Sequence, residues 1–166
     1  AIIGAAVVLI YLFGFREMRF FLVPSSSMEP TLWRSDYLIT LNDREYSRGN
    51  IVVIREPEQH DYIVKRIVGV AGDSLSVSDG ALYINGEYAS EPYIAEPMVY
   101  AIKTPVTVAP GQVFVMGDNR NFSEDSSSDL KTKPVSDIVG RVRFRYFPYD
   151  RFGAVRSYPL RNIFGQ

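Results

Sequence analysis

Hydrophobic residues follow one pattern at the start of this chain and a different one through the rest. The first fifteen positions, AIIGAAVVLIYLFGF, carry no charged side chain. A membrane-spanning helix needs about 20 such residues, and the chain begins with Ala, so we expect an anchor whose first part is missing. The alternatives are a buried core helix and the apolar stretch of a cleaved leader, but Phe15, Arg16 and Glu17 do not resemble the small residues of a cleavage site.

After Met18 the pattern changes to short runs rich in β-branched and aromatic residues. Each run is bounded by Gly, Pro, Asp or Asn, which is typical of strands. Ser78-Asp79-Gly80 favours a hairpin, and Asn85-Gly86 marks a second turn. We expect apolar strand segments at 20–23, 37–41, 51–54, 62–70, 74–77, 81–84, 113–116 and 138–147, and a polar loop at 121–134.

These runs predict a mostly β fold. No repeat and no helical period of useful length follows residue 18. We therefore expect antiparallel strands arranged as a barrel or as coiled sheets, behind one transmembrane helix. The expected organisation is an anchor at residues 1–18 and one β-rich domain at residues 19–166.

Composition narrows the chemistry that the chain can perform. Eighteen basic residues against 19 acidic ones give a net charge of -1, which does not indicate a nucleic-acid partner. The sequence has no cysteine and a single histidine, His60, so it excludes thiolate catalysis and a zinc site built on Cys or several His. We expect no metal and no cofactor, and we interpret His60 as an exposed loop residue.

Two serine-containing segments are candidate chemical sites, although neither is specific alone. Pro24 to Leu32 (PSSSMEPTL) is by itself a serine-rich turn between an apolar strand and Trp33. Met116 to Ser126 (MGDNRNFSEDS) leaves a strand as a polar loop, and by itself it is typical of a loop held by its own side chains.

A lysine in the segment Asp61 to Val70 (DYIVKRIVGV) is more unusual. Alternation along a strand puts Lys65 on the same face as Ile63 and Ile67. An ordinary lysine titrates near 10.4, and desolvation lowers that value. A neutral amine can take the proton from a serine hydroxyl, so the pattern indicates a general base, unless the side chain reaches water at a sheet edge.

Taken together behind an apolar N-terminus, these three segments resemble the bacterial type I signal peptidases, also called leader peptidases. That family shows the motifs P-S-x-S-M-x-P-T-L, K-R-I-V-G-x-x-G-D and G-D-N-R-x-x-S-x-D, which stand here at 24–32, 65–73 and 117–125. The resemblance covers nearly the whole chain. It implies a membrane-bound serine endopeptidase that removes signal peptides from exported preproteins and prefers small residues such as alanine before the scissile bond.

The resemblance also implies a catalytic role for matched residues. Ser27 is the expected nucleophile and Lys65 the general base, together a Ser-Lys dyad. The amide of Ser27 and the hydroxyl of Ser25 are the expected oxyanion hole. Ser123 is expected to orient the lysine amine.

Supporting and substrate-binding residues follow from the same resemblance. Asp118, Arg120 and Asp125 are expected to form a polar frame, in which Arg120 and Asp125 would pair. Shallow apolar pockets for the substrate are expected near Phe21, Val23, Met28, Leu32, Leu38, Ile63 and Val64. The alternative, that such residues are only core, applies above all to Leu38.

The chain departs from the family pattern at two places. The family usually continues D-S-R, then an aromatic residue and a glycine, whereas here Asp125-Ser126 is followed by Ser127-Ser128. This departure puts the local loop structure in doubt. Ser26 also stands where the family commonly has glycine, and we expect that small replacement to be tolerated.

The implied partners are preprotein signal peptides and the lipid bilayer. The resemblance implies a single-pass protein of the cytoplasmic membrane with its catalytic domain on the outer side, or of the thylakoid membrane in a photosynthetic source. Three other interpretations remain: a self-cleaving repressor of the SOS type, a pilin-processing peptidase of conjugation systems, and an inactive β-domain that binds apolar segments. The first is disfavoured by the apolar start and by Gly117-Asp118-Asn119-Arg120, and the last would use Phe144, Tyr146, Phe147 and Tyr149.

Overall fold

The computed structural model describes residues 18–160. The expected anchor at residues 1–18 lies outside these described residues except for Met18, which already belongs to the first strand. Within residues 18–160, none of the helices is both long and apolar enough to cross a membrane.

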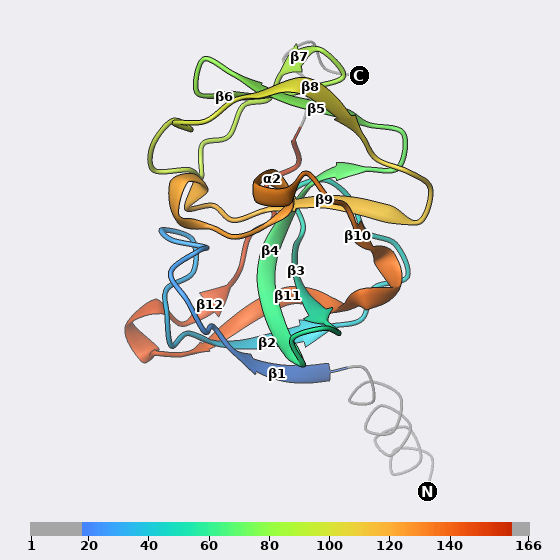
Figure 1. Ribbon diagram of the computed structural model, residues 1–166. Helices are drawn as coiled ribbons and strands as arrows, with labels where there is room; N and C mark the ends of the chain where they lie inside the picture. The colour runs from blue at the N-terminus through green and yellow to red at the C-terminus, as the bar shows by residue number, and fades with distance from the viewer. Residues whose placement is uncertain (1–17, 161–166) are drawn as a thin grey trace, which may run out of the picture.

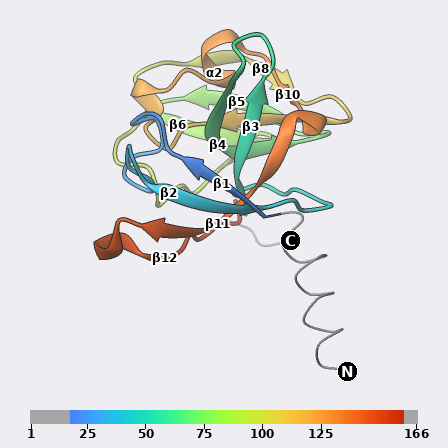
Figure 2. The same cartoon turned by 90° about the horizontal axis from the view of Figure 1, so that it is seen from below.

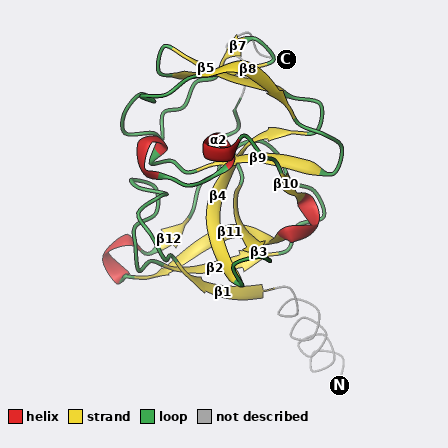
Figure 3. Cartoon of the chain, viewed as in Figure 1, coloured by secondary structure: helices red, strands yellow, loops and turns green. Residues whose placement is uncertain are grey.

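Antiparallel strands dominate the regular secondary structure of the described chain, as predicted, and they form two sheets (Figures 1 and 3). Within residues 18–160 the larger sheet has the order β1 (Met18–Leu22), β2 (Tyr37–Leu41), β11 (Ile138–Phe147), β3 (Ile51–Glu56), β4 (Asp61–Val70), β9 (Gln112–Met116) and β10 (Lys133–Pro134), with β12 (Gly153–Ala154) paired to β11. The second sheet has the order β7 (Glu87–Tyr88), β6 (Ala81–Ile84), β5 (Ser74–Ser78) and β8 (Ile102–Thr107).

The hairpin of β3 and β4 runs between the two ends of the molecule, with the second sheet above it and β1 and β2 below it in Figure 1. Seen from below in Figure 2, β1, β2 and β11 lie side by side, in keeping with their register. Alternate residues of β3 enter different core clusters: Ile51 and Val53 pack on one face, and Val52 and Ile54 pack on the other. The larger sheet is therefore buried on both faces at its centre, which explains why β3 and β4 read as nearly continuous apolar runs.

The second sheet begins with the hairpin that the sequence predicts. Ser78 pairs with Ala81, and the two residues between them, Asp79 and Gly80, have φ values of 50° and 77°. Positive φ at both central residues is the type I′ turn that fits the twist of a two-residue hairpin. The apolar side chains of β5 and β6 pack with Val68 and Phe114 of the larger sheet, so the two sheets share one core cluster.

Strand β8 and the short elements of the predicted loop are the main differences from the sequence analysis. Pro105 interrupts the strand pattern of β8, but β8 lies at the edge of its sheet, where a residue without an N–H group is tolerated. The stretch predicted as a loop at 121–134 contains the four-residue helix α2 (Ser126–Asp129) and strand β10. Elements of two to four residues are too short to show a period. The remaining helical turns, η1 (Arg120–Phe122), η2 (Val135–Asp137) and η3 (Tyr149–Arg151), are equally short.

Candidate active site

The serine-rich segment forms a compact turn between β1 and β2. Glu29 N donates to Ser26 O at 3.1 Å, and Leu32 N donates to Met28 O at 3.0 Å. Met28 and Leu32 are 1% and 0% exposed and enter the core cluster below the turn. The apolar positions of the motif therefore anchor the turn, while Ser25 and Ser26 stay at the surface.

Ser27 lies at the edge of this turn and is 8% exposed. The hydroxyl of Ser25 is 3.2 Å from Ser27 Oγ, and Ser27 N donates to Ser25 Oγ at 3.5 Å. The two groups expected to bind an oxyanion, the Ser27 amide and the Ser25 hydroxyl, thus lie next to the expected nucleophile.

Lys65 is on β4 opposite Val52, and it is 4% exposed. Its Nζ donates to Ser123 Oγ at 3.0 Å. Burial lowers the pKa of the Lys65 amine, and the nearby carboxylates, of which Asp125 acts most strongly, oppose this shift without cancelling it. A lysine with a lowered pKa is neutral more often at a given pH, which is what a general base requires.

A glycine brings the serine turn and the third motif into contact. A Cβ at Gly117 would lie 2.3 Å from Ser27 O and 2.3 Å from Ser123 Oγ, so only glycine fits between these groups. Asn119 N donates to Ser27 O at 3.0 Å, and Asn119 Nδ2 donates to Ser26 O at 3.1 Å. The loop after β9 therefore holds the backbone of the nucleophile turn directly.

Within the described part of the chain, Ser27 Oγ and Lys65 Nζ do not hydrogen-bond to each other; their bonds run to Ser25 and Ser123. Ser27 and Ser123 approach each other across Gly117, and Ser123 holds the amine. Catalytic hydrogen bonds are often long without substrate.

Asp118 joins all three motifs through one buried ion pair. Arg66, the neighbour of Lys65 on β4, donates from Nε to Asp118 Oδ1 at 2.7 Å and from Nη2 to Oδ2 at 2.6 Å. Thr31 Oγ1 donates to Asp118 Oδ2 at 2.5 Å. The guanidinium also donates to Gly49 O and lies 3.8 Å from the centroid of the Tyr93 ring. Sequence analysis placed Asp118 in the frame but missed Arg66, which stands beside the expected base and carries its own charge into the core.

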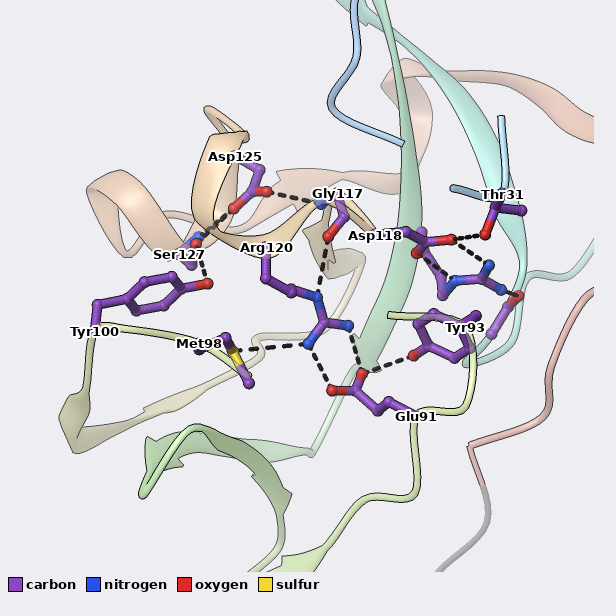
Figure 4. A network of polar contacts seen from close by, with 12 residues as sticks. Thr31, Glu91, Tyr93, Met98, Tyr100, Gly117, Asp118, Arg120, Asp125 and Ser127 are labelled. Carbon is purple, nitrogen blue, oxygen red and sulfur yellow. Dashed lines mark hydrogen bonds and ion pairs between the residues drawn. The ribbon is translucent and has the colours of Figure 1, made fainter. Parts of the chain in front are cut away.

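Arg120 pairs with Glu91, and the expected ion pair with Asp125 is wrong. Both terminal nitrogens of Arg120 donate to the Glu91 carboxylate, Nη1 at 2.6 Å, and Arg120 Nε donates to Gly117 O at 3.0 Å (Figure 4). Tyr93 Oη donates to the same carboxylate at 2.7 Å. Glu91 follows β7 of the second sheet and belongs to none of the three motifs, so no motif in the sequence indicated it.

Asp125 binds groups of its own loop instead. Its Oδ2 accepts from Gly117 N at 2.7 Å and from Ser123 Oγ, and its Oδ1 accepts from Ser127 N at 2.9 Å and from Ser127 Oγ at 2.7 Å. Asp125 is also the N-cap of α2. Ser127 therefore occupies the place beside Asp125 that the sequence had assigned to Arg120.

Most of the residues expected near the substrate pockets gather in one cluster. Ile63 is the exception, because it packs with Val52 and Ile54 on the other face of β4. The cluster contains Val23, Met28, Leu32, Leu38 and Val64, each at most 4% exposed, with Phe21 packed against it.

His60 is exposed in the turn between β3 and β4, as predicted. The acidic residues and His60 among residues 18–160 form no group that could hold a metal ion.

Comparison with known proteins identifies the family. The family model for signal peptidases, described as "Signal peptidase, peptidase S26", matches residues 1–147. The chain belongs to this signal peptidase family. The resemblance drawn from the three motifs is thereby confirmed, and so is the expected class of enzyme, a serine peptidase.

Individual signal peptidases agree with this assignment. The chain is 41% identical over 141 residues to a probable signal peptidase I-2 of Synechocystis, covering 79% of this chain and 64% of that protein. It is 37% identical over 143 residues to a signal peptidase I of Bacillus licheniformis, covering 78% and 77%. A crystal structure of a signal peptidase I from Enterococcus faecalis V583 superimposes with a TM-score of 0.52 at 28% identity, covering 59% of this chain and 97% of that one.

Replacing Gly117 by alanine tests the contact between the two loops. The added methyl group would overlap Ser27 O and Ser123 Oγ, and overpacking of this kind typically costs about 1–3 kcal/mol of unfolding free energy. We expect Gly117→Ala to lower the midpoint of urea unfolding and to reduce peptide-bond cleavage. Gly111→Asn is the control, because a Cβ there meets nothing within 4 Å and asparagine accepts the φ of 73°. Equal stability of the two variants would contradict the contact.

Replacing Lys65 by methionine tests the buried amine. The unfolded chain holds the lysine proton up to about pH 10.4, whereas the folded protein releases it at lower pH. Between the two pKa values the unfolded state binds more protons, so the stability of the wild type rises with pH through that window. We expect Lys65→Met to be more stable than the wild type at pH 6, and the difference to shrink as the pH approaches 10. A difference that does not change with pH would show that the lysine is not desolvated.

Proposed function

We propose that this chain is the catalytic part of a membrane-bound signal peptidase that cleaves preproteins with Ser27 as nucleophile and Lys65 as general base. The observation that carries the proposal is the buried amine of Lys65, with its lowered pKa, held by Ser123 next to the Ser27 turn. Membership of the signal peptidase family supplies the reaction.

The proposed reaction uses only groups of this chain and water. Ser27 Oγ attacks the carbonyl carbon of the scissile bond, and its proton passes to Lys65 Nζ. The tetrahedral intermediate breaks down as Lys65 returns that proton to the leaving amine, which releases the mature protein and leaves the signal peptide as an ester on Ser27. A water molecule, deprotonated by Lys65, then hydrolyses this ester.

The proposal assigns two hydrogen-bond donors to the developing oxyanion. Ser27 N–H and the Ser25 hydroxyl are adjacent, and the bond between them is long at 3.5 Å, so little is lost when both turn toward the substrate. Removing one such donor typically lowers kcat by about 100- to 1,000-fold. Ser25 is therefore proposed as a binding group for the transition state.

The proposed setting is a bilayer surface. The uncharged residues 1–15 are separated from β1 by two charged residues, Arg16 and Glu17. Aromatic side chains are exposed on β1, β2, the end of β11 and η3: Phe20, Tyr37, Phe147 and Tyr149. They make edge-to-face contacts with one another and with the half-buried Tyr146: Phe20 with Tyr146, Tyr37 with Tyr146 and Phe147, and Phe147 with Tyr149. Tyrosine and other amphipathic rings favour the membrane–water boundary. The proposal places the single-pass anchor and this aromatic surface at the same membrane, on the outer side, with preprotein signal peptides as the substrate.

Substitutions at Ser27 and Lys65 test the dyad. Ser27→Ala and Lys65→Ala should each abolish cleavage of a preprotein, and the double variant should be little worse than either single one because the two groups act together. Lys65→Arg should also fail, since guanidinium stays charged. Circular dichroism and thermal unfolding serve as controls for folding. Near-normal turnover by Lys65→Ala would refute the dyad. A wild-type protein that binds the preprotein but does not cleave it would favour the inactive β-domain.

Substrate variants test the proposed pocket. Val23, Met28, Leu32 and Val64 are buried in one cluster close to Ser27 in sequence or in space, and we propose that the substrate side chain before the scissile bond binds against them in a pocket shallow enough for a small residue only. We expect a preprotein with alanine directly before the scissile bond to be cleaved, and leucine or phenylalanine there to lower kcat/KM by at least about 100-fold, or about 2.7 kcal/mol. Measuring kcat/KM for the three variants of one preprotein decides the point. Equal values would place the pocket elsewhere.

A further inference from the structure

An unbroken chain of hydrogen bonds leads from a tyrosine of the connection before β8 to the amine of Lys65. Tyr100 Oη lies 3.1 Å from Ser127 Oγ, and Ser127 Oγ lies 2.7 Å from Asp125 Oδ1. The other oxygen of Asp125 accepts from Ser123 Oγ, and Ser123 accepts from Lys65 Nζ at 3.0 Å. Figure 4 shows the first part of this chain, with Ser127 between Tyr100 and Asp125.

The direction of every proton in this chain is determined by the carboxylate. An ionised carboxylate only accepts hydrogen bonds, so both Ser127 and Ser123 must donate to Asp125. Because Ser127 uses its only hydroxyl proton on Asp125, its oxygen must accept from Tyr100. Ser123 has likewise used its proton, so it can only offer a lone pair to Lys65.

This arrangement has a consequence for the base. One N–H of Lys65 must point at Ser123, which turns the remaining part of the amine away from Asp125. A neutral amine carries a single lone pair, and fixing one N–H restricts where that lone pair can point. Each hydrogen bond of the chain therefore contributes to fixing the direction of the lone pair.

We propose that Ser127, itself held by Tyr100, is a positioning residue that fixes the hydrogen-bonding state of Asp125 and Ser123 and so aims Lys65 at Ser27. This inference rests on the proposed function of the dyad. The geometry that supports it is that Ser127 gives Asp125 two donors, its amide and its hydroxyl. Ser127 does not touch the reacting atoms, and it acts through two intervening side chains.

Kinetics of Ser127→Ala test the proposal. The variant keeps the backbone N–H bond to Asp125 and loses only the hydroxyl, so we expect kcat to fall about tenfold with KM unchanged. Ser127→Thr restores a hydroxyl and should recover most of the rate. Ser78→Ala is the matched control, because Ser78 also donates to an aspartate, Asp79, but does so at an exposed turn of the second sheet; its kcat should equal that of the wild type.

A double-mutant cycle separates positioning from a general loss of structure. If Ser127 acts through Ser123, Ser127→Ala should change kcat by less than about twofold in a protein that already carries Ser123→Ala. If Ser127 merely supports α2, the two losses should multiply, and that result would overturn the proposal. An unchanged kcat in Ser127→Ala alone would also overturn it.

Tyr100→Phe provides a second test, independent of how well Ser127→Ala folds. Tyr100, Ser123 and Ser127 line a cavity of about 450 Å³, so water can replace part of the lost hydroxyl bond. We therefore expect a smaller loss of kcat, about threefold, that vanishes in the Ser123→Ala background. Tyr88→Phe, at an exposed tyrosine of β7, is its control. A loss that persists at full size without Ser123 would contradict the proposed chain.

The titration of Lys65 gives a readout that does not need activity. Asp125 raises the pKa of Lys65 by its charge, and removing a donor leaves that charge less neutralised, so Ser127→Ala should move both the Lys65 titration and the acid limb of kcat/KM to higher pH. NMR of lysines labelled at Cε follows this directly, since the chain has four lysines and Lys65→Arg assigns the signal. The carboxylates that act on Lys65 stay the same in all variants: Asp125, Glu124, Glu56 and Asp118.

The outcomes distinguish the two proposals. Cleavage that survives both Ser27→Ala and Lys65→Ala would refute the proposed function, while the Lys65 titration would still test the chain of hydrogen bonds. Loss of cleavage in those two variants, together with an unchanged rate and an unchanged titration in Ser127→Ala, would refute the positioning role alone.

Discussion

The ion pair between Arg66 and Asp118 is the interaction on which the site depends. Both side chains have 0% exposure, and their two hydrogen bonds tie β4 to the loop after β9. Thr31, in the serine turn, donates a hydrogen bond to the same carboxylate. Removing one partner of a buried pair leaves an uncompensated charge and typically costs about 3–5 kcal/mol, so neither residue can vary alone. Lys65 and Gly117, which are the neighbours of this pair in sequence, are thereby held at fixed positions relative to each other.

The protonation of Lys65 depends on a balance between its burial and the charges of nearby carboxylates. Burial alone would keep the amine neutral, and carboxylates alone would keep it charged. The structure combines the two, with burial the larger effect. The same carboxylates also hold the amine in place, since Asp125 binds the serine that binds it. In a fully apolar pocket the lysine amine would also be neutral, but no hydrogen bond would fix the direction in which it points.

The sequence predicted best what depends on local pattern. Strands β2, β6 and β11 match their expected bounds, and β1, β3, β4, β5 and β9 match within two residues, because alternation and turn residues mark them clearly. Arg120 shows the limit: the sequence placed it in the frame but paired it with Asp125, an acid of the same motif. Its true partner, Glu91, lies 29 positions away in the chain, and such a contact follows from the packing of the two sheets, which no local pattern encodes.

The distances along the chain between contacting residues have a consequence for biosynthesis. Thr31 meets Asp118 across 87 positions, and Asp36 meets Arg145 across 109. Contacts this far apart must wait for the later segment to be synthesised and are slow to form. A nascent chain that stops before β9 carries both the serine and the lysine, yet it lacks the loop that brings them together. The loop that carries Asp118 is therefore added only after both the serine turn and β4 have been translated, so the contacts that hold these parts together form late in synthesis.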